Sequence, residues 1–199
     1  MHMFEECLET LLKTTKHHSN CIYLVVDDHS TDETEEFVNR VKKRHDNMLY
    51  HRHTSNSGIT SSLNDSLEIL RTEECAYFFI LNDDISFIKA GWSDLYIKGI
   101  LQSGIRHFNF TDGRNIIGRK QYGEITITYH NWVRGCLEVF SRDAYKNVGG
   151  YSTEFQDFGC YDLDLSDRMI LNGFTDKYLE HLLPGFDSYR ANFLKKVPF

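Results

Sequence analysis

Two patterns of apolar residues alternate along the first half of the chain. From Phe4 to Leu12 and from Leu63 to Leu70 they recur at helical spacing, which predicts amphipathic helices. Residues 21–26 and 76–81 are continuous apolar runs of strand length, typical of strands buried on both faces. A short strand is expected at residues 48–53. Strands that alternate with helices predict an α/β domain with a mostly parallel sheet covered by helices.

A further helix is expected after residue 30, with Phe37, Val38 and Val41 as its buried stripe. Ser30 and Glu33 have the spacing of a capping box, in which the serine is the N-cap residue. A strand, a carboxylate at its tip and a capped helix together form half of a βαβ unit.

The pattern changes after residue 84. A helix is expected from Trp92 to Leu101, followed by short strands at residues 106–110, 123–129 and 135–140. Another helix starts near Asp162, and the tail from residue 177 is strand-like and then irregular. Because the chain shows no repeat and no linker, we expect one domain, residues 1–199. Its first half, residues 1–100, alternates strands and helices. Its second half, residues 101–199, is smaller and contains short, mixed strands.

Composition narrows the possible partners. The 199 residues carry a net charge of −7, which argues against nucleic acid, since that partner needs a basic stripe. No apolar run is long enough to span a bilayer, and no signal peptide opens the sequence. The five cysteines are scattered and odd in number, which favours reduced thiols and a cytoplasmic location.

Pairs of carboxylates follow two of the predicted strands. Asp27 and Asp28 end the first, and Asn82, Asp83 and Asp84 end the second. An exposed acidic turn is one interpretation. The other is a binding site, because ligands of open α/β sheets lie beyond the carboxyl ends of the strands. Oxygen ligands there suit a hard cation that also holds phosphates, so we expect a metal–diphosphate site.

His51 and His53 point the same way along the strand at residues 48–53, as a pair of metal ligands would. Their sequence neighbours supply no further ligand, so we do not expect a zinc site here.

Four ordered segments resemble one family, the GT-A-fold glycosyltransferases of the family-2 type. Residues 25–32 (VVDDHSTD) resemble its V-V-D-D-G-S-T-D segment, and residues 56–66 resemble N-x-G-x-x-x-A-R-N-x-G. Residues 81–84 (LNDD) resemble its D-x-D element. Residues 142–168 resemble R-x-x-F-x-x-V-G-G-[FY]-x-E-x-F followed by E-D-x-D-L-x-x-R. The resemblance covers roughly residues 5–190 and implies a GT-A (Rossmann-like) sheet. It also implies that residues 1–100 form the nucleotide-binding half and residues 101–199 a smaller, mixed β half for the acceptor and catalysis.

The resemblance implies a nucleotide-sugar donor, UDP-linked or dTDP-linked. Asp28 would accept the ring N–H of the base, although a helix-terminal charge is the alternative. Asn56, Gly58 and Asn64 would let backbone and side-chain amides approach the nucleotide. The alternative is that residues 56–58 form a plain turn and that Asn64 is an asparagine on the surface of a helix. Leu63 stands where the family often has arginine, so one phosphate contact is not expected.

The resemblance also implies a metal, Mn²⁺ or Mg²⁺, bridging the donor diphosphate. Asp84 would be its firmest ligand, and Asp83 would hold the ribose or a metal-bound water. Asn82, which replaces the first acid of the family's element, would contact the nucleotide sugar. His181 resembles the late histidine that completes such metal sites, with a structural histidine as the alternative.

Asp162 falls where the family places its general base, which takes the acceptor hydroxyl's proton in an inverting displacement. The preceding acid is Tyr161 here. Asp162 could instead be an N-cap residue, with Asp157 as the reserve candidate for the base. We expect Asp164 to fix the loop, and Trp132 and Tyr151 either to stack on sugars or to belong to the core.

The sequence therefore predicts a metal-dependent, inverting glycosyltransferase that acts on a glycan, glycoprotein or other hydroxyl acceptor. Two rivals remain. A sugar nucleotidyltransferase should carry a glycine- and lysine-rich phosphate loop near its start, and this sequence has none there. A degenerate domain that binds nucleotide or glycan without turnover is the non-enzymatic alternative.

The family begins with a strand that pairs beside residues 22–26, whereas this sequence starts in the following helix. We therefore expect that strand position to be empty, filled by another chain, or filled by upstream residues.

Overall fold

The computed structural model describes residues 2–110, 116–130, 135–155 and 160–175, together with the backbone of two strands near the C-terminus. These are β9 (Leu179–Leu182) and β10 (Leu194–Lys196).

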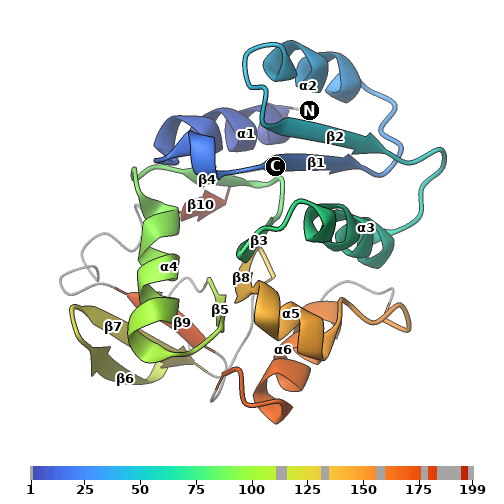
Figure 1. The fold of residues 1–199 in the computed structure, drawn as a ribbon. Coiled ribbons are helices and arrows are strands. Elements are labelled where there is room, and N and C mark those ends of the chain that lie inside the picture. The colour runs from blue at the N-terminus through green and yellow to red at the C-terminus, as the bar shows by residue number, and fades with distance from the viewer. Residues whose placement is uncertain are drawn as a thin grey trace.

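The first half alternates helices and strands in the predicted order (Figure 1). Its elements are α1 (His2–Thr14), β1 (Tyr23–Asp27), α2 (Thr34–Lys42), β2 (Met48–Arg52), α3 (Ile59–Thr72) and β3 (Tyr77–Leu81). A short 3₁₀ turn, η1 (His18–Asn20), leads into β1. The strands β1 and β2 are parallel and in register from Tyr23–Met48 to Asp27–Arg52. The carboxyl end of β1 and the start of the loop after β2 therefore lie side by side.

The chain after residue 84 contains mostly short strands. Its elements are β4 (Ile85–Phe87), α4 (Trp92–Ser103), β5 (His107–Asn109), β6 (Ile116–Tyr122), β7 (Ile125–His130), β8 (Leu137–Ser141), α5 (Arg142–Val148) and α6 (Cys160–Leu171). Strand β8 pairs with both β3 and β5, and β7 pairs with both β6 and β9. Every one of these pairings is antiparallel, as is that of β10 with β4.

The expected sheet is thus realised only in part. Among the described strands, β1 and β2 form the one parallel pair, and they share no ladder with β3. A cavity of about 460 Å³ separates β1 from β3. It is lined by residues 22–26, by residues 75–79 and by the inner face of α1. Whether another strand fills this groove, as the expected first strand would, stays a prediction.

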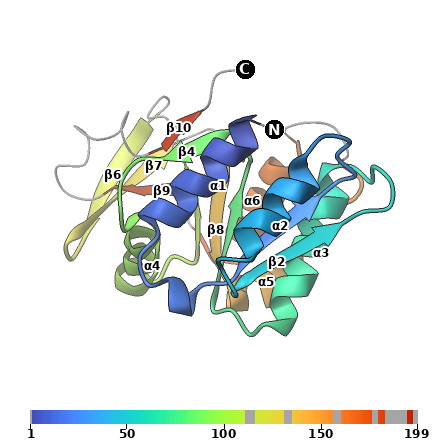
Figure 2. The same ribbon diagram turned by 90° about the horizontal axis from the view of Figure 1, so that it is seen from above.

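Helix α1 covers the groove. It buries Cys7, Leu8 and Leu11, which are spaced as the sequence pattern predicts. Figure 2 shows α1 between the β1–β2 pair on one side and α4 with β6, β7 and β9 on the other. The Cys7 thiol also approaches the backbone oxygen of Asn82, at 3.6 Å, so the helix contacts the turn after β3.

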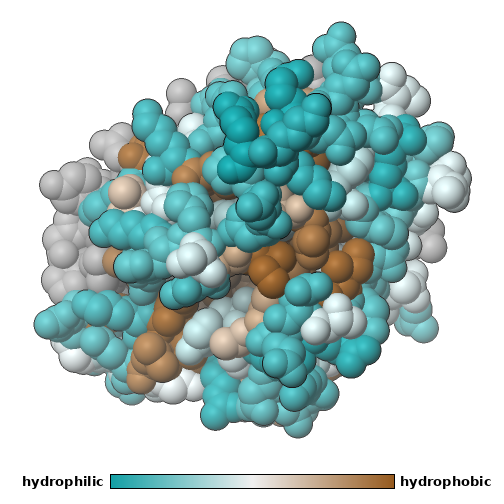
Figure 3. Space-filling view, turned by 45° about the horizontal axis from the view of Figure 1, so that its top comes forward, coloured by the Kyte–Doolittle hydropathy of each residue, from teal (hydrophilic) through white to brown (hydrophobic). Residues whose placement is uncertain are grey.

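Strand β8 separates two hydrophobic clusters. Leu137 and Val139 belong to the larger one beneath α1 and α4, and Phe140 belongs to the smaller one beneath α3, α5 and α6. This is the two-residue alternation of a strand buried on both faces. The face drawn in Figure 3 is mostly hydrophilic, with hydrophobic side chains gathered toward its centre.

The predicted capping box is wrong. Helix α2 begins at Thr34, and its N-cap residue, Glu33, makes no side-chain cap bond. Asp32 takes that role from two residues before the helix, accepting from the Thr34 backbone N–H at 3.1 Å and from its hydroxyl. The backbone N–H of Ser30 donates to the carboxylate of Asp27 at 2.7 Å, so Ser30 belongs to the turn after β1.

Candidate active site

Asp27 and Asp28 end β1 with different partners. Asp27 points inward and is 3% exposed; its carboxylate accepts from the Ser30 N–H (2.7 Å) and the Tyr50 hydroxyl (2.6 Å). Burial alone would raise the pKa of Asp27, but these hydrogen bonds and the Arg52 guanidinium hold it below its usual value. Asp27 therefore fixes the turn, which leaves Asp28 facing the neighbouring loop.

Asp28 holds the loop that follows β2. Its carboxylate accepts from the backbone N–H groups of Ser57 (2.7 Å) and Gly58 (2.9 Å) and from Nδ1 of His53 (2.8 Å). Burial would raise its pKa, and these three bonds outweigh that effect and lower it. The side chain of Asn56 is exposed on the same loop. The loop residues expected at the nucleotide are thus gathered around Asp28.

Gly58 is required by its backbone conformation. Its φ is 86°, in the region that favours glycine, and it is the residue directly before α3. A Cβ added there would meet no atom within 4 Å, so the space beside the loop is open.

Asn64 links the two halves of the chain. Its amide donates to the Tyr151 carbonyl and accepts from the Tyr151 N–H, each at 2.8 Å. A Cβ on Gly150 would collide with the same amide oxygen. In this structure Asn64 therefore joins α3 to the segment before α6, and both polar groups of its side chain have partners within the chain.

The turn between β3 and β4 carries Asn82, Asp83 and Asp84. Asp83 is exposed, whereas Asp84 is only 8% exposed. Asn82 and Asp83 line the end of the groove beside Val26. The carboxyl ends of β1 and β3 thus open on the same cavity, as a binding site at the end of an α/β sheet requires.

Asp162 approaches the segment at residues 135–136, which contacts this turn. It is in the first turn of α6, is 5% exposed, and accepts from the Leu163 N–H at 2.9 Å. A Cβ on Gly135 would come within 2.6 Å of its Oδ2, so only glycine lets the backbone approach. The next residue, Cys136, accepts the Asn82 N–H at 3.1 Å. The predicted base and the predicted metal turn are therefore connected through residues 135–136.

Burial raises the pKa of the Asp162 carboxyl, and hydrogen bonds from the backbone N–H groups of Leu163 and Gly135 partly oppose this. The alternative that Asp162 is an N-cap residue is wrong, because α6 already begins at Cys160.

A second buried acid, which the sequence analysis missed, lies behind Asp162. Glu138 on β8 is 1% exposed and accepts from the Tyr151 hydroxyl at 2.5 Å. Burial raises its pKa to about 8, with the Asp162 charge acting in the same direction. Tyr151 itself is 4% exposed and its ring lies 5.8 Å from that of Tyr161, so it belongs to the core rather than to a sugar-stacking surface.

Asp164 fixes the loop, as predicted. Its carboxylate accepts from Arg168 at 2.7 and 2.9 Å, and the same guanidinium donates to the carbonyls of Val148 and Gly150.

Trp132, Asp157 and the side chain of His181 lie outside the described residues. The backbone of His181 is in β9, paired with Ile127.

The expectation that His51 and His53 lack a third ligand is wrong. Asp65 on α3 completes a group whose ligand atoms lie within 4.8 Å of one another. Sequence reasoning missed it because Asp65 belongs to a different element. Glu138 could have been found as the one charged residue in the apolar run at residues 136–140.

Residues 2–96 match the model of glycosyl transferase family 2. Residues 122–191 match the model described as the N-terminal domain of galactosyltransferase. No curated protein sequence matches the chain. Among solved structures, the mannosyltransferase PcManGT from Pyrobaculum calidifontis, in complex with GDP-Man and Mn²⁺, aligns with a TM-score of 0.68 at 17% identity. That alignment covers 87% of this chain and 49% of the mannosyltransferase. The chain has a GT-A glycosyltransferase fold.

Two further structures support the GT-A assignment. GalNAc-T7 with UDP, GalNAc and Mn²⁺ aligns with a TM-score of 0.69 at 14% identity, over 87% of this chain and 38% of that one. TarS of S. aureus aligns with a TM-score of 0.64 at 17% identity, over 89% of this chain and 33% of the TarS chain. The GT-A chain described here thus spans half or less of the length of these structures. In its described part, no helix is both long enough and apolar enough to cross a membrane.

Proposed function

We propose that this GT-A domain transfers a sugar, with inversion, from a UDP- or dTDP-linked donor to a hydroxyl of a glycan or glycoprotein. The observation that carries the proposal is the connection of Asp162 through residues 135–136 to the turn at Asn82. A buried carboxylate beside an acidic turn provides the two chemical functions that glycosyl transfer needs: a proton acceptor and a site for the departing diphosphate.

The nucleotide is assigned to the corner around Asp28. A carboxylate offers about four acceptor positions, and Asp28 uses three of them on His53, Ser57 and Gly58. The remaining position suits the ring N–H of uracil or thymine. The exposed amide of Asn56 and the open space beside Gly58 support an approach of the nucleotide to this loop. We assign Asn64 to the scaffold, because Tyr151 occupies its amide.

The residues present fit a hard divalent cation, Mn²⁺ or Mg²⁺. Asp83 and Asp84 place two carboxylates in one turn at the end of a strand, and such oxygen ligands are those that these ions prefer. Asp84, partly shielded from water, is assigned as the protein ligand and Asp83 as a contact to ribose or to a metal-bound water. When bound, the cation would stabilise the negative charge of the departing nucleotide diphosphate.

Asp162 is assigned as the general base. Its raised pKa improves its match to the proton of a sugar hydroxyl, and the Leu163 and Gly135 N–H groups orient the carboxylate. It would take the acceptor's proton while the acceptor oxygen attacks the anomeric carbon from the side opposite the diphosphate. That geometry inverts the anomeric centre.

Nucleotide release tests the proposal. The full chain with Mn²⁺ should release UDP or dTDP from one of a panel of nucleotide sugars, including GDP-sugars as a comparison, and EDTA should abolish this release. A domain that only binds would show nucleotide binding without any release. A sugar nucleotidyltransferase would instead release pyrophosphate from a nucleoside triphosphate and a sugar phosphate. Either result would contradict the proposal.

A further inference from the structure

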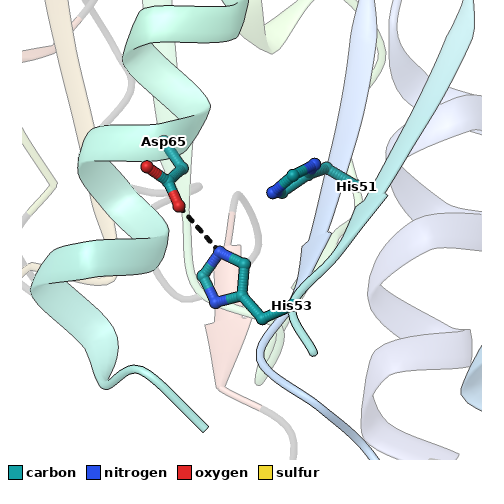
Figure 4. A group of neighbouring side chains, drawn as sticks. All are labelled: His51, His53 and Asp65. Carbon is teal, nitrogen blue, oxygen red and sulfur yellow. Dashed lines mark hydrogen bonds and ion pairs between the residues drawn. The ribbon is translucent and has the colours of Figure 1, made fainter. Parts of the chain in front are cut away.

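His51, His53 and Asp65 form a cluster that shares no residue with the acidic turn at 82–84, and the proposed transfer assigns no role to them. The two histidines project from the end of β2 and the loop after it toward Asp65 on α3 (Figure 4). Their rings are 5.3 Å apart, and the possible ligand atoms of all three residues lie within 4.8 Å of one another. Two elements thus bring two imidazoles and a carboxylate to one point.

We propose that His51, His53 and Asp65 form a zinc site. Two imidazole nitrogens and one carboxylate oxygen are the ligand types that suit Zn²⁺, whereas Mn²⁺ and Mg²⁺ prefer sites made of oxygen. Three protein ligands leave a fourth position for water in the tetrahedral geometry of zinc.

His53 is already oriented as a metal ligand. Its Nδ1 donates to Asp28 at 2.8 Å, and Asp28 is itself held by the N–H groups of Ser57 and Gly58. A carboxylate that accepts one ring N–H of a ligating histidine fixes the ring and leaves the other nitrogen for the metal. That other nitrogen, Nε2, is hydrogen-bonded to Oδ2 of Asp65 at 2.8 Å, and a metal bound to both atoms would replace this contact. Asp28 thus holds the His53 ring in place from the side away from the metal.

The remaining adjustment is small. Zinc–nitrogen bonds are about 2.0–2.1 Å, so tetrahedral ligand atoms lie roughly 3.3 Å apart. Atoms separated here by 2.8 to 4.8 Å would move by about 1 Å or less toward that geometry. The side chain of His53 is 7% exposed and serves as the anchor, whereas that of Asp65 is 47% exposed and can rotate. The exposed side also gives the ion a route from solvent.

The charges balance as well. Asp65 as a ligand and Asp28 behind His53 together supply two negative charges for one Zn²⁺. The site goes beyond glycosyl transfer, because its ligands come from β2 and α3 and its existence does not depend on any activity. Its contact with Asp28 would attach the loop at residues 57–58 more firmly to the end of β1.

Calorimetric titration of the metal-free full chain with Zn²⁺ tests the site. The four cysteines that are not buried are alkylated beforehand, since free thiols also bind zinc, whereas Cys7 is buried in the core and is left unmodified. We expect one zinc per chain. Replacing a residue that hydrogen-bonds to a metal ligand typically lowers metal affinity by about 10–100-fold. Removing a ligand itself, by His51→Ala or Asp65→Asn, should therefore weaken zinc binding by at least about tenfold. His45→Ala, which removes a histidine outside the cluster, is the matched control.

Cobalt provides an independent measurement. Co²⁺ in the alkylated chain should give visible absorption bands of a four-coordinate ion, which His51→Ala should remove and His45→Ala should keep. Both cluster variants change partly exposed side chains, and circular dichroism confirms that each is folded. No zinc binding by the folded wild-type chain, or equal affinity in the wild type and both cluster variants, would overturn the proposal. In that case His53 only bridges two carboxylates.

Discussion

The hydroxyl of Tyr151 donates a 2.5 Å hydrogen bond to Oε2 of Glu138, and both residues are buried. Desolvation of the charged form raises the pKa of Glu138 to about 8, and the negative charge of Asp162 adds to this effect. The folded protein therefore keeps a neutral carboxyl behind Asp162 at neutral pH.

This pKa makes stability depend on pH. The ordinary glutamate value is 4.5, so between pH 4.5 and about 8 the unfolded chain releases a proton that the folded chain retains. The stability contributed by Glu138 is complete below that window and falls as pH rises through it, by at most about 1.4 kcal/mol per pH unit. Glu138→Gln, which is neutral at every pH, should remove this fall. Urea unfolding at pH 5, 6, 7 and 8 measures it.

The exposed Glu154→Gln serves as the control for Glu138→Gln and should keep the wild-type pH dependence. If the wild type and Glu138→Gln lose stability in parallel between pH 5 and 8, Glu138 is ionised in the folded protein and the predicted cause is wrong.

Asp84→Asn should abolish metal-dependent nucleotide binding while leaving the fold intact, because the change is nearly isosteric but removes the anionic ligand. Calorimetric titration with UDP in the presence and absence of Mn²⁺ measures this. Asp46→Asn, at an exposed position before β2, is the control and should bind as the wild type does. Unchanged UDP affinity in Asp84→Asn would rule out the metal assignment.

Asp162→Asn should lower turnover by about 10²–10⁴-fold, the typical contribution of a general base. Donor affinity should hardly change, because the base faces the acceptor. Steady-state rates and UDP titrations of the same preparations separate the two effects, with the exposed Asp167→Asn on the same helix as control. Near-wild-type transfer by Asp162→Asn would redirect the search to Asp157.

Gly150→Ala should destabilise the protein by about 1–3 kcal/mol, the usual cost of forcing a methyl group into a packed site. The added Cβ would collide with the Asn64 oxygen and break its two bonds to Tyr151. Gly118→Ala is the control, since its Cβ meets no atom within 4 Å. Adding Asn64→Ala to Gly150→Ala removes the collision, so the two losses in unfolding free energy should sum to more than that of the double variant. Additive losses would mean that the two residues do not interact.

Hydrogen exchange tests the groove beside β1. Strand β8 is paired on both sides, whereas β1 pairs only with β2 among the described strands. Amides of Tyr23–Asp27 should therefore exchange faster than those of Leu137–Ser141. Equal protection of the two strands would mean that another segment pairs with β1 in solution, as the predicted first strand would.

Local patterns were enough to predict most of the elements. The helices at α1, α3 and α4 and the strands at β1, β2, β3 and β8 follow from hydrophobic periodicity, which depends only on neighbouring residues. The predicted start of α2 was wrong because Asp27 and Asp32 both accept from N–H groups between β1 and α2, and sequence spacing alone does not show which side chain binds which N–H group. The parallel sheet was overestimated, since strand partners are long-range contacts.

In the candidate site, too, local sequence suggested individual residues but not their long-range partners. The motifs predicted roles for Asp28, Asp84 and Asp162, because each lies at the end of a recognisable strand or in the first turn of a recognisable helix. They did not reveal that Asn64 binds the backbone of Tyr151, 87 positions away, or that Asp65 lies opposite His53. Such partners depend on how α3 packs against both halves, and no local pattern encodes that.

The groove between β1 and β3 has a mechanical consequence. Among the described strands no ladder of backbone hydrogen bonds joins the β1–β2 pair, which ends at Asp28, to the sheet of β3, β8 and β5. These two parts are coupled instead through α1, which contacts Asn82, and through the Asn64–Tyr151 pair. Side-chain contacts of this kind yield more easily than a continuous sheet. A donor that contacts both Asp28 and Asp84 would therefore connect the two parts, and the domain would be stiffer with the donor bound than without it.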